Sequence, residues 1–157
     1  MIIEIPGYRT LEINNLVLDY NGTIALDGEI PQSVKERICV LAKECGLSVY
    51  VLTADTHGTA RSMCEGLPLT IMTFPGDSAM YEKQRIIKEL GADVSMAVGN
   101  GRNDVLMCRE AVLSAAIIGV EGAFSGLIAE TTVTVRSIED ALDLLIKPKR
   151  LIATLRG

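Results

Sequence analysis

The hydrophobic positions of the chain follow two alternating patterns. Short runs that are apolar on both faces, such as residues 16–19 (LVLD), alternate with stretches in which apolar residues recur every three or four positions. The first pattern is typical of strands buried in a parallel sheet, and the second predicts amphipathic helices that cover it. The fold class that follows is α/β, a doubly wound parallel sheet in a three-layer, Rossmann-like sandwich.

The same patterns predict individual elements. Core strands are expected at residues 16–19, 48–54, 69–74, 95–100, 113–119 and 132–135, and helices at 34–45, 59–64, 78–90, from 103 onward, and at 138–145. Ser33 with Glu36 reads as a capping box, and Ser137 with Asp140 as the cap of the last long helix. Pro148 should kink or end that helix.

Residues 2–13 (IIEIPGYRTLEI) predict two short strands joined across Pro6 and Gly7, a hairpin outside the core sheet. With 157 residues and no linker, repeat or low-complexity segment, the chain is expected to form one domain over residues 1–157, with the hairpin in residues 1–14.

Composition narrows the function. The net charge of −5 argues against binding to nucleic acid or to an anionic membrane, because both attract basic surfaces. The one basic cluster is more consistent with a solvated helix end than with a binding patch. It consists of Lys147, Lys149, Arg150 and Arg156.

Cysteine usage and hydropathy indicate a cytoplasmic protein with reduced thiols and no membrane span. The four cysteines are scattered without a CxxC pair, which argues against a zinc site. The N-terminal residues lack the pattern of a signal peptide. The most apolar stretch, residues 111–120, is about half the length needed to cross a bilayer.

Three polar segments follow predicted strands and should meet at one rim, since ligands bind at the carboxyl ends of parallel strands. They are Asp19, Thr53 and residues 99–104 (GNGRND). Taken alone, each has a simpler explanation: Asp19 as a turn residue, Thr53 as a helix cap, and the third segment as a tight turn. Lys83, on a predicted amphipathic helix, would by itself be read as solvated surface.

The order of these segments resembles the haloacid dehalogenase superfamily of phosphohydrolases, and within it the phosphorylation domain of P-type ATPases and their small soluble relatives. DYNGT at residues 19–23 stands where those pumps carry Asp-Lys-Thr-Gly-Thr. EKQRIIKEL at 82–90 resembles their lysine-containing helix, and VGNGRNDVLM at 98–107 resembles their Gly-Asp-Gly-x-Asn-Asp hinge. The resemblance covers residues 16 to about 150.

The resemblance implies a chemistry in which Asp19 is the nucleophile that becomes an aspartyl phosphate. The catalytic residues it implies are Asp19, Thr53, Lys83 and Asp104. The phosphate would be bound by Asn21, Gly22, Thr53, Ala54, Lys83 and Asn103, with the amides around Asn21 and Gly22 cradling it. A Mg²⁺ cofactor would be held by Asp19, the Asn21 carbonyl, Asn100 and Asp104.

Two residues depart from the family pattern. Asn21 occupies the position where phosphatases of the superfamily have a second Asp as general acid and base, and an amide cannot exchange a proton in that way. Such assistance is worth ~10² to 10⁴ in rate, so a slow enzyme is expected. Asn100 replaces the metal-binding Asp, which should weaken Mg²⁺ binding, and leaves Asp104 to bind the metal directly or through water.

The connections where the family inserts a cap domain, residues 23–33 and 74–78, are too short for one. By the resemblance, capless members accept large substrates or form oligomers in which a neighbour closes the site. The apolar hairpin residues could serve such a homo-oligomer or pack in the chain's own core, and both readings stay open. These residues are Ile2, Ile3, Ile5, Leu11 and Ile13.

The function expected is a magnesium-dependent phosphohydrolase acting on a phosphorylated substrate. The pumps' nucleotide-binding insertion and membrane helices are absent, so this chain alone is not expected to transport ions. The alternatives are a catalytically impaired binding or regulatory protein that retains the phosphate site, and a receiver-like phosphoacceptor, which fits the order of motifs poorly. His57, the sole histidine, reads as a capping or surface residue before it reads as a substrate contact.

Overall fold

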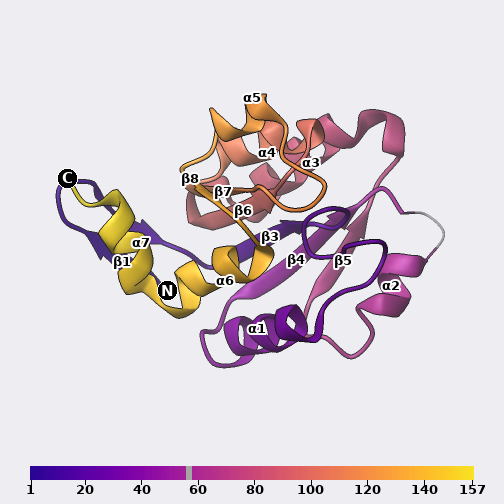
Figure 1. Ribbon diagram of the computed structural model, residues 1–157, viewed down its shortest axis with the longest axis horizontal. Coiled ribbons are helices and arrows are strands. Elements are labelled where there is room, and N and C mark those ends of the chain that lie inside the picture. Colours follow the sequence, from indigo (N-terminus) through magenta and orange to yellow (C-terminus); the bar gives the residue numbers. More distant parts are fainter. Residues whose placement is uncertain (56–57) are drawn as a thin grey trace.

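The computed structural model describes residues 1–55 and 58–157, and its elements alternate as the sequence predicts (Figure 1). The strands are β1 (Ile2–Ile5), β2 (Arg9–Glu12), β3 (Asn15–Asp19), β4 (Ser48–Thr53), β5 (Thr70–Thr73), β6 (Ser95–Gly99), β7 (Leu113–Ile117) and β8 (Val133–Val135). The helices are α1 (Gln32–Lys43), α2 (Thr59–Met63), α3 (Ala79–Leu90), α4 (Val105–Glu110), α5 (Ser125–Ile128), α6 (Ile138–Ile146) and α7 (Pro148–Leu155).

Six parallel strands form the central sheet in the order β5-β4-β3-β6-β7-β8. From β3 the chain builds outward to β4 and β5, then returns to β6 on the other side of β3 and builds outward again. The direction of winding therefore reverses between β3 and β6. In doubly wound sheets, ligands bind beyond the carboxyl ends of the strands at this reversal.

Helices cover both faces of the sheet, with α3, α4 and α5 on one side and α1, α2 and α6 on the other (Figure 1). All five residues of β3 are buried, and their side chains alternate between two apolar clusters. Leu16 and Leu18 pack on the side of α1 and α6, and Val17 packs on the side of α3 and α4. Burial on both faces explains why this strand is apolar throughout. The predicted three-layer α/β fold is confirmed.

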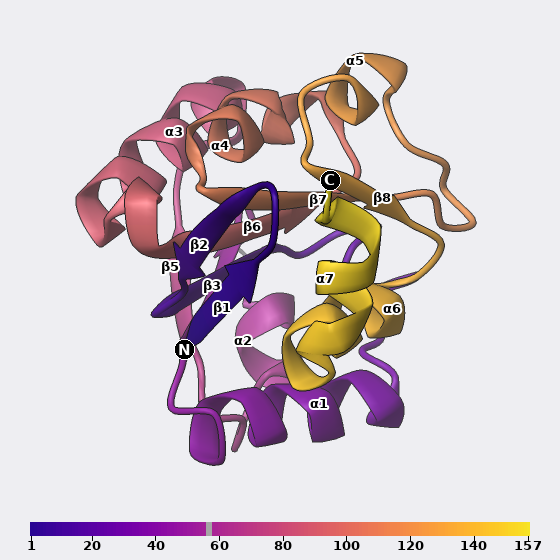
Figure 2. The same cartoon turned by 90° about the vertical axis from the view of Figure 1, so that its left-hand side faces the viewer.

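The hairpin of β1 and β2 forms a separate antiparallel sheet beside α7, at the end of the molecule where both termini lie (Figure 2). Of its apolar side chains, Ile3, Ile5, Leu11 and Ile13 are buried within the chain's own core. Ile2 is the exception, with 70% of its surface exposed. Most of the apolar surface of the hairpin is therefore used internally.

Helix ends agree with the sequence in part. Ser137 caps α6 by accepting a hydrogen bond from the Asp140 amide at 3.1 Å, and Pro148 separates α6 from α7, both as predicted. The capping box at Ser33 is wrong: α1 begins after Pro31, and the Ser33 hydroxyl instead donates to Glu139 Oε1 at 2.7 Å. The short helix α5 is an addition that the sequence did not predict.

The connections that could carry a cap domain are short in the structure. Residues 20–31 form a compact flap that is closed by bridges between Asn21 and Ala25 and between Leu26 and Glu29. In residues 74–78, Pro75 has an extended backbone and the three residues after it form one 3₁₀ turn. Within residues 1–55 and 58–157, no helix has the length and hydrophobicity that a membrane crossing requires. The four cysteines are free, as expected.

Candidate active site

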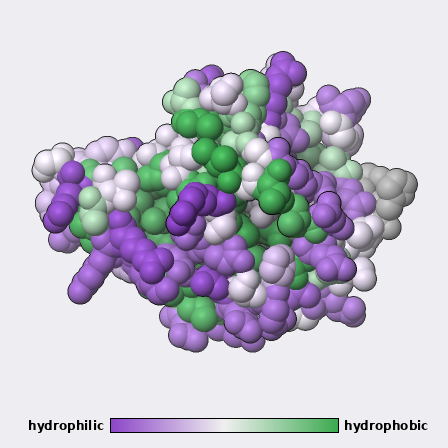
Figure 3. Space-filling view, viewed as in Figure 1, coloured by the Kyte–Doolittle hydropathy of each residue, from purple (hydrophilic) through white to green (hydrophobic). Residues whose placement is uncertain are grey.

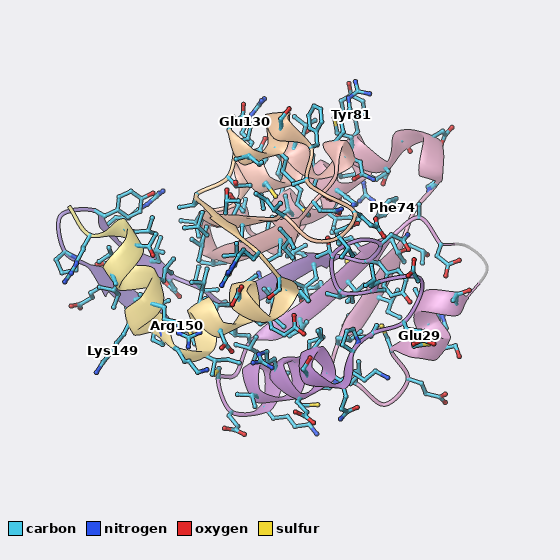
Figure 4. The ribbon with its side chains drawn as sticks, in the orientation of Figure 1. Glu29, Phe74, Tyr81, Glu130, Lys149 and Arg150 are labelled. Atoms are coloured by element: carbon cyan, nitrogen blue, oxygen red, sulfur yellow. The ribbon has the colours of Figure 1, made fainter. Side chains whose placement is uncertain are left out.

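A polar cavity of about 250 Å³ opens at the carboxyl ends of β3, β4 and β6, where the sequence predicted the three polar segments to meet. Residues from six segments line it: Asp19, Asn21, Thr53, Ala54, Phe74, Lys83, Asn100, Gly101, Asn103 and Glu121. Most of the predicted site residues are in this set. Phe74, labelled in Figure 4, follows β5 and supplies the main apolar wall.

Asp19 is the last residue of β3, and its side chain is almost completely buried. One carboxylate oxygen, Oδ1, accepts a hydrogen bond from Lys83 Nζ at 2.5 Å. The other, Oδ2, accepts one from the Thr23 hydroxyl at 3.1 Å. The carboxylate is thus fixed in orientation at the floor of the cavity.

Lys83 lies on the buried face of α3, and only 1% of its surface is exposed. Its ammonium group bridges two carboxylates, because it also donates to Asp104 Oδ1 at 2.6 Å. The surface interpretation of Lys83 is therefore wrong. A lysine is almost never fully buried unless its charge is paired, and here it has two partners.

Asp104 is fully buried behind Lys83 and does not line the cavity. Its second oxygen, Oδ2, accepts hydrogen bonds from the amides of Asn100 at 3.1 Å and Gly101 at 2.9 Å. Both carboxylate oxygens are therefore already bonded. This arrangement suits Asp104 for positioning Lys83 and the loop after β6 rather than for direct contact with a metal ion.

Burial and the neighbouring charges shift the pKa values of Asp19 and Lys83. Burial raises the pKa of Asp19 to about 7, with a further contribution from the negative charge of Asp104, against the opposing effect of Lys83. Burial alone would lower the pKa of Lys83, but the two carboxylates raise it above its ordinary value, so the ammonium stays charged. With all three groups ionised, the cluster carries one uncompensated negative charge.

Thr53, Ala54 and Asn103, which the resemblance implied as phosphate-binding residues, lie on the wall of the cavity. The Thr53 side chain is buried, and its hydroxyl oxygen accepts a hydrogen bond from the Asp55 amide at 3.0 Å. Since that bond uses the oxygen as acceptor, the hydroxyl proton can still be donated to a ligand. His57 lies outside the described residues.

Gly22 allows the flap to pack closely against the neighbouring loops of the site. Its amide donates to the Ala25 carbonyl within the flap at 2.9 Å, so it is not available to cradle a phosphate as the sequence had suggested. Its φ of +71° favours glycine. A side-chain carbon here would lie 2.5 Å from both Asn100 Nδ2 and Glu121 Oε2, so only glycine lets the flap pack this closely against the two neighbouring loops.

Asn100 joins these loops. Its Oδ1 accepts a hydrogen bond from the Thr23 hydroxyl at 3.4 Å, and its Nδ2 donates to the Gly122 carbonyl at 3.3 Å. Sequence reasoning did not identify Phe74, Gly101 or Glu121 as site residues. Gly101 lay inside a quoted motif, but nothing local marked Glu121, whose loop is brought to the cavity by the order of the strands.

The oxygen donors of the cavity fit Mg²⁺. Among residues 1–55 and 58–157, no three acidic, histidine or cysteine side chains approach closely enough to form a metal cage. The cavity is lined instead by two carboxylate residues, Asp19 and Glu121, and by Asn21 and Asn100. Mg²⁺ in phosphate-processing sites is typically held by one or two carboxylates together with substrate oxygens and water, which matches this set.

An apolar groove of about 290 Å³ adjoins the cavity. It lies between the flap and the loop after β7, and Glu121 lines both spaces. Leu26 and Val120, two of its lining residues, are exposed. Figure 3 shows apolar side chains gathered over the middle of the same face of the molecule, between α5 and α6.

Two uncharacterized proteins of Methanocaldococcus jannaschii are related to the chain in sequence. One is 42% identical over 83 residues, which are 50% of this chain and 89% of the relative. The other is 49% identical over 41 residues, which are 26% of this chain and 89% of the relative. The chain belongs to the same protein family as these two. No model of a known protein family matches it.

Solved structures identify the fold as that of the haloacid dehalogenase superfamily, as the motifs implied. The 3-deoxy-D-manno-octulosonate 8-phosphate phosphatase of Moraxella catarrhalis, in complex with magnesium, phosphate and KDO, superposes with a TM-score of 0.72 at 14% identity, covering 92% of this chain and 94% of that one. The cobalt-bound deoxy-D-mannose-octulosonate 8-phosphate phosphatase of Haemophilus influenzae superposes with a TM-score of 0.73 at 11% identity, covering 93% of this chain and 94% of that one. A putative hydrolase of the superfamily from Streptomyces avermitilis gives 0.70 at 16%, covering 88% and 87%.

Proposed function

We propose that this chain, which has the haloacid dehalogenase fold, is a magnesium-dependent phosphohydrolase that transfers a phosphoryl group to Asp19 and then to water. The observation that carries the proposal is the position of Asp19: a buried carboxylate held by Lys83 and Thr23 at the reversal of the sheet, facing a polar cavity. The phosphatase activity of proteins with the same fold supports it.

In the first step, a carboxylate oxygen of Asp19 attacks the phosphorus atom of a phosphate ester. The bond from phosphorus to the leaving oxygen breaks, and an aspartyl phosphate forms. Lys83 stabilises charge on both the carboxylate and the phosphoryl oxygens, and Thr53 and Asn103, which line the same cavity, donate hydrogen bonds to those oxygens in this proposal. In the second step, water attacks the phosphorus, releasing inorganic phosphate and restoring Asp19.

Mg²⁺, held by Asp19, the Asn21 carbonyl and Asn100, would neutralise negative charge on the phosphoryl group. Burial raises the pKa of Asp19 first and the negative charge of Asp104 second, and a bound cation would oppose both effects by favouring the ionised carboxylate. Asp104 acts on the reaction through Lys83, which it fixes in place.

The site has an amide, Asn21, at the position from which a general acid and base would transfer protons. Asn21 lines the cavity where the superfamily's phosphatases have an acid and base, and an amide cannot protonate the leaving oxygen or deprotonate the attacking water. We therefore expect slow turnover, with leaving groups that need no protonation, such as aryl oxides, favoured over alkoxides.

The direct test is phosphate release from p-nitrophenyl phosphate with and without Mg²⁺. Asp19→Asn should lower kcat/KM by at least about 10³-fold, because it removes the nucleophile and keeps the shape. Asp143→Asn, a change of the same kind at a buried aspartate outside the cavity, should leave kcat/KM unchanged. Activity that survives in Asp19→Asn would overturn the proposal.

The replacement of two family aspartates by Asn21 and Asn100 favours a second candidate, a regulatory protein that binds phosphate without turnover. The variant Asn21→Asp separates the two. If the chain is a slow enzyme, this change should raise kcat by about 10²-fold. If catalysis has been lost altogether, neither this variant nor the wild-type protein will release phosphate, and beryllium fluoride will not form the acyl-phosphate mimic, which requires a competent nucleophile and metal site.

A further inference from the structure

We propose that Glu121 provides the divalent cation with the carboxylate that Asn100 lacks. The inference rests on the proposed function, since it concerns the metal site of that reaction. The second charged ligand of the cation would then come from the loop between β7 and α5. Asn100, the residue it compensates for, lies on the loop after β6, the strand between β3 and β7.

The first observation is proximity. Glu121 lines the cavity together with Asp19 and Asn100. Its Oε2 atom and Asn100 Nδ2 both lie 2.5 Å from the single point where a side-chain carbon on Gly22 would stand. The Glu121 carboxylate and the end of the Asn100 side chain thus lie against the same point of the flap.

The second observation is how the loop is held. Asn100 fixes the segment that follows Glu121, since Asn100 Nδ2 donates to the Gly122 carbonyl and the Asn100 carbonyl accepts from the Phe124 amide at 2.9 Å. A turn closed by the Gly122 amide and the Gly119 carbonyl, at 2.9 Å, presents Val120 and Glu121 at its tip. An aspartate at position 100 could not donate the bond to Gly122.

Asn100 and Glu121 therefore form a matched pair. The amide at position 100 anchors the loop that carries the carboxylate, and it avoids placing two carboxylates side by side. Reversing the pair, with Asp at 100 and Gln at 121, would keep the charge of the rim. Changing one member alone would remove a charge or create a repulsion.

The third observation is that the Glu121 carboxylate has no ion-pair partner among residues 1–55 and 58–157. In the part of the chain that the structure describes, no lysine or arginine forms an ion pair with it. Lys83 can balance only one of the two negative charges of Asp19 and Asp104. A divalent cation between Asp19 and Glu121 would balance the remaining charge and that of Glu121 itself.

The experiment is a titration of the full chain with Mn²⁺, followed by electron paramagnetic resonance of the free ion, with no substrate present. Glu121→Gln should weaken binding about tenfold, because the charge of the ligands sets the affinity of such sites. Glu44→Gln, which removes an exposed carboxylate at the end of α1, should bind Mn²⁺ like the wild-type protein. The thermal midpoint without metal controls for folding and should not change in either variant.

The double variant Asn100→Asp/Glu121→Gln should recover most of the lost affinity, because it returns a carboxylate to the same point. Equal Mn²⁺ affinity of Glu121→Gln and the wild-type protein would overturn the role of Glu121 while leaving the phosphohydrolase proposal intact, since that proposal is tested by phosphate release. A double variant as weak as Glu121→Gln would overturn the equivalence of the two positions. A wild-type protein that binds no Mn²⁺ would overturn both the inference and the magnesium dependence.

Discussion

Asp19 and Asp143 are almost equally buried, with 7% and 6% of their surface exposed, and their electrical surroundings are opposite. Asp19 shares one lysine with a second carboxylate. Asp143, on α6, is contacted by three cations: Arg37 at 2.9 Å, Lys147 at 2.8 Å and Arg150 at 3.1 Å. Arg150 extends from α7, where it is labelled in Figure 4.

Their pKa values shift in opposite directions. Burial raises the pKa of Asp19 to about 7. Burial would also raise the pKa of Asp143, but hydrogen bonds from Lys147 and Arg37 outweigh it and hold that pKa below its ordinary value. The cluster at Asp143 is satisfied by the chain itself and ties α1, α6 and α7 together. The cluster at Asp19 lacks positive charge, which is what a site that receives a cation and a phosphoryl group requires.

The largest effect is expected from Lys83→Met, which keeps the length of the side chain and leaves two buried carboxylates without a cation. The cost should be about 3–5 kcal/mol of unfolding free energy. Urea unfolding at neutral pH without metal measures it. Lys88→Met is the matched control on the same helix, because Lys88 is 54% exposed in its pair with Glu110, and should cost less than about 0.5 kcal/mol. Equal costs for the two variants would contradict the account.

A smaller effect, of opposite sign, is expected from Asp19→Asn. Because the folded-state pKa of Asp19 is raised, its stabilising contribution is present below its ordinary value of 3.8 and is lost as the pH rises through about 7. Without metal, the free energy of unfolding of the variant, relative to that of the wild-type protein, should therefore increase by about 1–3 kcal/mol when the pH is raised from 5 to 8. Urea unfolding at the two pH values measures it. A gain that is larger at pH 5 would contradict the predicted charge state.

The smallest effect is expected from Asp143→Asn. Its three cations are 28%, 50% and 54% exposed and can return to water, so the loss at neutral pH should be about 1–2 kcal/mol. Because the pKa of Asp143 is lowered in the folded state, its carboxylate stabilises the folded protein at pH values above 3.8, the ordinary pKa. This stabilisation is lost as the pH falls through the folded-state pKa. The difference from the wild-type protein should therefore shrink toward pH 3, and a constant difference would argue against ion pairing.

Most of the fold could be predicted because strands and helices impose different hydrophobic periods on the sequence. β3 and α3 are examples in which the hydrophobic period identified the element, whereas the assignment of Asp19 and Lys83 to a site came from the order of the motifs along the chain. The capping box at Ser33 failed because its hydroxyl bonds to Glu139, 106 positions away, which no local pattern reveals. The helix α5 has four residues, too few to show a period.

The candidate site was predictable where motifs lie at strand ends, and less so where long-range contacts decide. Asp19, Thr53 and Lys83 meet as the motif order implied. The burial of Lys83 depends on two carboxylates from different segments, so the sequence of α3 alone could not show it. Glu121 lies on a loop whose place at the cavity follows only from the parallel pairing of β6 with β7.

The measurement closest to the central claim is mass spectrometry of the protein quenched in acid during turnover of an aryl phosphate with Mg²⁺. The account predicts the added mass of one phosphoryl group on the peptide that contains Asp19, disappearing as substrate is exhausted and absent from Asp19→Asn. Steady release of phosphate with no phosphoryl group ever found on Asp19 would contradict it.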